Sequence, residues 1–101
     1  MSTSYKKYMN NERIREVLIA FVEKYKIKKI VLFGSRADGT NTDRSDVDLI
    51  IEFSIPVSLI TLSQMQFEME EALGLNVDIV HGPIREDDLI EIGKEIVLYA
   101  A

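Results

Sequence analysis

Two aspartates separated by one residue stand at the start of an apolar run, residues 46–53. Aspartate is uncommon in strands. If this run is a strand, Asp46 and Asp48 lie on one face with their Cα atoms about 6.6 Å apart. Two carboxylates placed in this way repel each other, and a divalent cation removes that repulsion. A site made only of oxygen ligands favours Mg²⁺ or Mn²⁺. The alternative is a strand whose outer face is simply solvated.

A third aspartate, Asp78, lies in a second apolar run, residues 77–80. Its neighbours Val77 and Ile79 would point to the opposite face of a strand. If the two runs are adjacent strands, the three carboxylates converge on one face. Taken alone, Asp78 is also consistent with a surface acid near a strand end.

A glycine and a serine follow the apolar run 30–33, at the point where the chain becomes polar. Gly34 allows the backbone to approach a ligand closely, and Ser35 adds a hydroxyl donor. At the start of a helical turn, such residues and their N–H groups can hold phosphate. Arg36 could add a cationic contact to phosphate. The alternatives are an ordinary Gly-Ser turn and a surface arginine.

The elements that position these residues follow from the spacing of apolar side chains. Helical spacing predicts one helix over residues 12–25, capped by Asn10 or Asn11, and a second helix between Ser58 and Gly74. Short apolar runs predict strands at 30–33, 46–53, 77–80 and 96–99, with a short helix at about 86–94 and one helical turn within 35–46. This order predicts an α/β fold with helices against one face of a sheet.

Composition narrows the classes of function. The 101 residues carry a net charge of −5 and include no cysteine, which excludes thiol nucleophiles, disulfides and cysteine-based metal sites. The acidic balance argues against direct nucleic-acid binding. No apolar run is long enough to span a membrane, and the first residues do not resemble a signal peptide. We therefore expect a single cytoplasmic domain over residues 1–101 that acts on an external substrate.

In this order, the Gly-Ser turn at 34–35, the Asp-x-Asp strand at 46–48 and Asp78 resemble the nucleotidyltransferase superfamily of DNA polymerase beta. The resemblance covers residues 30–80, and the chain length is similar to that of the minimal nucleotidyltransferases. The resemblance implies a polymerase-beta-like α+β fold with a mixed sheet of about four strands and helices on one face. It also implies an enzyme that uses two Mg²⁺ ions, with Mn²⁺ as a substitute, and ATP as donor substrate.

The resemblance also implies a role for each residue of the motif. Asp46 and Asp48 would ligate the metal ions, and Asp78 would act as a further ligand or as base. Gly34 and Ser35 would hold the β- and γ-phosphates. The family commonly has a basic residue where this chain has Asp38, so the turn carries less positive charge than the pattern implies.

Members of this family act as antitoxins that transfer AMP to a tyrosine of a HEPN-domain toxin encoded beside them. The resemblance therefore implies a HEPN partner protein. The oligomeric state stays open, although a small domain with free sheet edges could pair with itself or with its partner. Two alternatives stay open. The chain could neutralise its partner by occlusion without catalysis, or it could transfer a nucleotide to a small molecule.

Overall fold

The structure is a computed structural model, and it describes residues 9–84 and 93–101. Within these residues the elements run in the order α1 (Asn11–Ile19), α2 (Val22–Tyr25), β1 (Ile27–Phe33), α3 (Ser35–Asp38), β2 (Val47–Phe53), α4 (Leu59–Leu73), β3 (Val77–His81) and β4 (Glu95–Ala100).

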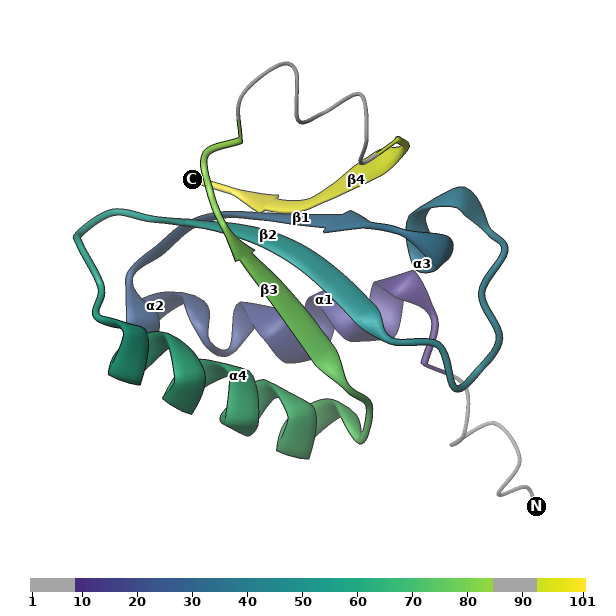
Figure 1. Cartoon of the computed structure of the whole chain (residues 1–101), viewed down its shortest axis with the longest axis horizontal. Helices are drawn as coiled ribbons and strands as arrows, with labels where there is room; N and C mark the ends of the chain where they lie inside the picture. The colour runs from purple at the N-terminus through teal and green to yellow at the C-terminus, as the bar shows by residue number, and fades with distance from the viewer. Residues whose placement is uncertain (1–8, 85–92) are drawn as a thin grey trace.

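The strands form one mixed sheet in the order β3-β2-β1-β4. β1 is antiparallel to both β2 and β4, whereas β2 and β3 are parallel. A parallel pair needs a crossover connection, and α4 provides it. Helices α1, α2 and α4 lie along one face of the sheet, and α3 lies at the end of β1 (Figure 1). This arrangement confirms the expected α+β fold.

The core lies between the sheet and the helices on that face. Its fully buried side chains are Ile14, Leu18, Ile30, Leu32, Val47, Leu49, Ile51, Met65, Met69 and Val77. Because side chains alternate along a strand, the burial of Val47, Leu49 and Val77 turns Asp48 and Asp78 to the opposite face. The hydrophobic pattern therefore determines which face carries the acids.

The helix predicted over residues 12–25 is interrupted. At Ala20 and Phe21 the backbone N–H groups donate to the carbonyls three residues earlier, at 3.3 Å and 2.9 Å, and the chain forms the separate helices α1 and α2. This tighter hydrogen bonding separates α2 from α1, and Tyr25 at the end of α2 is buried. Of the two candidate caps, Asn10 is used, because its side chain accepts a hydrogen bond from the Arg13 N–H at 2.8 Å.

The other elements follow the expected pattern with small changes at their ends. Ser58 caps α4, and Gly74 ends it in the left-handed conformation, as predicted. β2 begins at Val47, so Asp46 lies just before the strand and not inside it. Residues 86–92 of the predicted helix 86–94 lie outside the described residues, and Gly93 and Lys94 are not helical. Across the described ranges, no helix has the length and apolar character needed to cross a bilayer.

The edge strand β4 contains a bulge at Leu98. Its pairing with β1 shifts between Ile30, opposite Tyr99, and Val31, opposite Val97, which leaves Leu98 without an opposite residue. The Arg15 side chain from α1 donates its Nε–H to the Leu98 carbonyl at 3.0 Å. A helix side chain thus satisfies a backbone group that the sheet leaves unpaired.

A polar cluster joins α2 to α4. The Glu68 carboxylate accepts hydrogen bonds from the Tyr25 hydroxyl at 2.6 Å, from Lys24 Nζ at 2.9 Å and from Gln64 Nε2 at 3.2 Å. These bonds lower the pKa of Glu68 to about 2, and the bond from the Tyr25 hydroxyl has the largest effect. The charged form of Glu68 therefore stabilises the contact between the two helices.

We predict that Glu68→Gln lowers the free energy of unfolding at neutral pH. A carboxylate with a lowered pKa adds stability above its unfolded pKa, about 4.3, and loses it as pH falls towards 2. Urea unfolding should therefore show a difference between wild type and variant at pH 7 that shrinks towards pH 2. Glu71→Gln is the matched control on the exposed side of α4; an equal loss of stability in that control would contradict the role of Glu68.

Candidate active site

The structure brings Asp48 and Asp78 together on the sheet face opposite the core helices. In the parallel pairing of β2 with β3, Asp48 is directly opposite Asp78. Asp48 is half-buried, whereas Asp78 is exposed. The prediction that the two acidic runs are adjacent strands with their aspartates on one face is therefore confirmed.

The electrostatics of Asp48 reflect this crowding. Burial raises the pKa of Asp48, and the charge of Asp78, a hydrogen bond between the two carboxyl groups and the charge of Asp46 raise it further. Burial and the neighbouring acids thus disfavour the ionised form of Asp48. A bound cation would reverse this balance.

Asp46 stands less close. It is exposed just before β2, and although its charge reaches Asp48, no group of three or more acidic or histidine side chains near enough to hold a metal ion occurs within residues 9–84 and 93–101. The structure therefore pairs two of the three predicted carboxylates. The crowded, uncompensated oxygen atoms of Asp48 and Asp78 do fit a hard divalent cation such as Mg²⁺.

Gly34 lies against the Asp48 carboxylate. A Cβ atom at this position would overlap Oδ2 of Asp48 and lie 3.2 Å from its Cγ. The φ angle of Gly34 is +76°, in the region that favours glycine. The backbone at the start of α3 and an acidic side chain of β2 are therefore direct neighbours, so a ligand held by one also meets the other.

Ser35 opens α3, a single helical turn. The carbonyl of Gly34 accepts the N–H groups of Ala37 and Asp38 at 3.0 Å and 3.1 Å. The first N–H groups of a helical turn have no partner within the turn. The N–H groups of Ser35 and Arg36 are therefore at the start of this turn, and the phosphate-binding role of Gly34 and Ser35 stays a prediction.

Arg36 occupies a position that the sequence did not predict. It is 3% exposed, and its guanidinium donates to the carbonyls of Ser45 at 3.1 Å, Met9 at 2.7 Å and Asp43 at 3.4 Å. Burial lowers its pKa. In this conformation the guanidinium bonds to backbone carbonyls, so Arg36 is neither the expected phosphate contact nor a surface arginine. Its bonds to Asp43 and Ser45 stabilise the loop that leads to Asp46.

Asp38 also has a local role. Its Oδ1 accepts hydrogen bonds from the hydroxyl and the N–H of Thr40, at 2.6 Å and 2.9 Å. Both bonds lower the pKa of Asp38, and the bond from the Thr40 hydroxyl has the larger effect. The acid that replaces the basic residue of the family pattern therefore stabilises the end of the turn.

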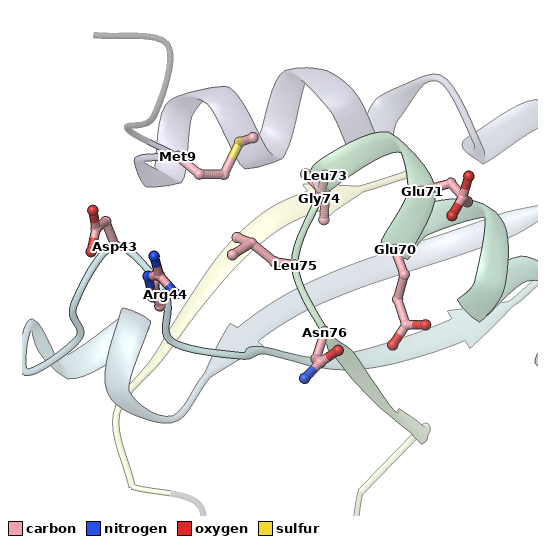
Figure 2. A pocket seen from close by; sticks show the side chains of 9 residues that line it. All are labelled: Met9, Asp43, Arg44, Glu70, Glu71, Leu73, Gly74, Leu75 and Asn76. Atoms are coloured by element: carbon pink, nitrogen blue, oxygen red, sulfur yellow. The ribbon is translucent and has the colours of Figure 1, made fainter. Parts of the chain in front are cut away.

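A hollow of about 910 Å³ lies beside the residues that precede β2 and β3 (Figure 2). Its lining includes Arg44 from the loop before β2, Glu70 from α4, and Leu75 and Asn76 from the segment before β3. Neither Asp48 nor Asp78 lines it. This hollow is thus separate from the acidic pair.

We predict that Arg36→Ala lowers the free energy of unfolding by about 2–3 kcal/mol, since three carbonyls lose a charged donor. Arg44→Ala is the matched control, because Arg44 is exposed in the same loop, and it should change stability by less than about 0.5 kcal/mol. Chemical denaturation measures both. Similar stabilities for the two variants would refute the structural role of Arg36.

For Asp48→Asn, we predict a higher free energy of unfolding at pH 7 in the absence of metal. A carboxyl group with a raised pKa contributes full stability below its unfolded pKa, about 3.9, and loses it as pH rises through the folded value. The gain should therefore shrink at pH 3, as measured by urea unfolding in EDTA. Added Mg²⁺ should raise the melting temperature of the wild type only. A variant that is less stable at pH 7 would contradict this assignment.

Comparison with known proteins assigns the chain to a family. The family model described as "Nucleotidyltransferase domain" matches residues 14–98, which include both acidic strands and the Gly-Ser turn. A Methanocaldococcus jannaschii protein, provisionally named as a protein adenylyltransferase, is 35% identical over 72 residues, which are 71% of this chain and 77% of the relative.

Two solved structures share the fold. A crystal structure of a toxin–antitoxin with AMP-PNP aligns with a TM-score of 0.72 at 22% identity, over 86% of this chain and 73% of the other. A complex of the tri-AMPylated Shewanella oneidensis HEPN toxin with its MNT antitoxin aligns with a TM-score of 0.66 at 18% identity, over 89% of this chain and 72% of the other. The fold, the acidic pair beside a Gly-Ser turn and the family match agree: this chain belongs to the nucleotidyltransferase domain family, as a minimal enzyme of the nucleotidyltransferase type.

Proposed function

We propose that this protein transfers AMP from ATP to a hydroxyl group of a partner protein, in a reaction that depends on Mg²⁺, and that the acceptor is a tyrosine of a HEPN-family toxin. The observation that carries the proposal is the placement of the Asp48 and Asp78 carboxylates next to each other, with Asp48 against Gly34. Metal-ligating oxygens and the N–H groups of a phosphate-binding turn are then neighbours.

Each residue of the site has a role in this proposal. Asp46 and Asp48 hold the metal ions, and Asp78 acts as a further ligand or as the base that accepts the proton of the attacking hydroxyl. The N–H groups at the start of α3 and the Ser35 hydroxyl hold the β- and γ-phosphates. Arg36 contributes indirectly, by fixing the loop that ends at Asp46.

The reaction is a displacement at phosphorus. The acceptor oxygen attacks the α-phosphorus of ATP, the bond between this phosphorus and the bridging oxygen to the β-phosphorus breaks, and pyrophosphate leaves. Mg²⁺ held by the carboxylates of the site would lower the pKa of the attacking hydroxyl and offset the charge of the leaving group. The protein holds donor and acceptor in line, and most of the remaining rate gain comes from this positioning.

The choice of acceptor rests on the similar proteins. The relative from Methanocaldococcus jannaschii is provisionally named for transfer of adenylyl groups to protein, and one solved complex with this fold holds a HEPN toxin that carries AMP. We extend both features to this chain: it acts in the cytoplasm, in a complex with a HEPN-domain protein, as the antitoxin of the pair. Within the described residues Asp78 is exposed and Asp48 half-buried, which supports access by a tyrosine that the partner presents.

The test is transfer of label to the partner. With ATP labelled at the α-phosphate and with Mg²⁺, the wild type should label a HEPN-family protein encoded beside it. The double variant Asp46→Asn plus Asp48→Asn should label it at least about a hundredfold more slowly, because metal ligands are lost. Glu71→Gln, which changes an exposed acid on α4, is the control and should retain full activity.

Three outcomes would contradict the proposal or a part of it. Equal labelling by the double variant would reject the carboxylate mechanism. If the wild type binds the HEPN protein without labelling it, and the double variant still protects cells from that protein, the chain is an antitoxin that acts by occlusion. Replacement of the acceptor tyrosine by phenylalanine should abolish labelling, and persistent labelling would identify a different acceptor group.

A further inference from the structure

The backbone of Val77 is held by two side chains of α4. The Gln66 side chain donates from Nε2 to the Val77 carbonyl at 2.7 Å, and the Val77 N–H donates to Oε2 of Glu70 at 3.0 Å. Both polar groups of one backbone residue are thus satisfied by side chains. Figure 2 shows Glu70 extending from α4 towards the start of β3, next to Asn76.

These bonds compensate for a missing strand. Among residues 9–84 and 93–101, β3 is an edge strand that pairs with β2 alone. Asn76 faces β2, because its carbonyl accepts the Val47 N–H at 2.9 Å, so the N–H and carbonyl of the next residue point to the outer edge. Gln66 and Glu70 are one helical turn apart on α4 and therefore present an acceptor and a donor side by side.

The residue after Val77 is Asp78. Its side chain is exposed, so packing around that side chain does not fix its position, and the placement of the carboxylate depends on the strand backbone. The buried Val77 side chain and the two bonds from α4 hold that backbone at its first strand residue. Metal sites lose affinity when their ligands are displaced by fractions of an ångström.

We infer that Gln66 and Glu70 are positioning residues for the metal site, which hold β3 in the placement that keeps the Asp78 carboxylate beside that of Asp48. This inference rests on the proposed function and extends it from the sheet face to a helix on the opposite side. In the structure both side chains bond to the Val77 backbone. Their effect passes through the Val77 backbone.

The test compares two replacements of one residue. Glu70→Ala and Glu70→Gln remove the same charge, but the amide oxygen of glutamine can still accept the Val77 N–H. Mn²⁺ binding is measured by electron paramagnetic resonance, with Gln66→Ala as a third variant and Glu71→Ala as the matched control. All titrations are made well below the unfolding temperature of each variant.

We expect Glu70→Ala and Gln66→Ala to weaken Mn²⁺ binding by about tenfold or more, the usual effect of losing an outer-shell partner. Glu70→Gln and Glu71→Ala should bind within about twofold of wild type. Hydrogen exchange at the Val77 amide should be faster in Glu70→Ala than in Glu70→Gln, which reports the bond without metal.

The outcomes separate this inference from the proposed function. If the wild type binds Mn²⁺ and Glu70→Ala binds it as tightly as Glu70→Gln, the positioning role is overturned while the metal site stands. If the wild type binds no Mn²⁺, the proposed metal-dependent function fails, and the positioning role fails with it. A Glu71→Ala variant as weak as Glu70→Ala would also overturn the inference, because the effect would then be one of charge.

Discussion

The parallel pairing of β2 with β3 is the constraint on which the site depends. It places Asp48 directly opposite Asp78, where burial first and then the charge of Asp78 raise the pKa of Asp48. Parallel strands cannot be joined by a tight turn, so the 15 residues of α4 form part of the crossover connection from β2 to β3. The burial of Met65, Met69 and Leu73 fixes this helix under the sheet. Hydrophobic burial thus supports an arrangement of charges that is unfavourable by itself.

The strongest sequence signals were those in which local preference and function conflict. Aspartate in an apolar strand pattern is such a conflict, and the structure places Asp48 and Asp78 at one point of one face. Side chains alternate between the two faces of a strand, and the apolar set had to be buried. This alternation therefore predicted the face on which the aspartates lie. The glycine signal was equally physical, since the positive φ and the close Asp48 carboxylate at Gly34 leave no room for a side chain.

The remaining features depend on contacts between distant parts of the chain, which no local pattern encodes. Arg36 stands in a polar loop and looks like surface, yet the fold surrounds it with three backbone carbonyls. Gln66 and Glu70 have the ordinary polarity of a helix flank, and only the position of β3 gives them partners. The break at Ala20 has no glycine or proline to announce it. Side chains that serve the backbone elsewhere are therefore the class that sequence patterns miss.

The bulge at Leu98 has a consequence for how the molecule meets others. A sheet edge with free N–H and carbonyl groups invites another chain to add a strand, which leads to fibre-like stacking when the added chain is a copy. On β4, the Leu98 carbonyl already accepts a hydrogen bond from Arg15. On β3, two side chains of α4 bond to the N–H and the carbonyl of Val77. At these two points neither edge can template a neighbour. Association by β-augmentation is therefore disfavoured at Leu98 and at Val77.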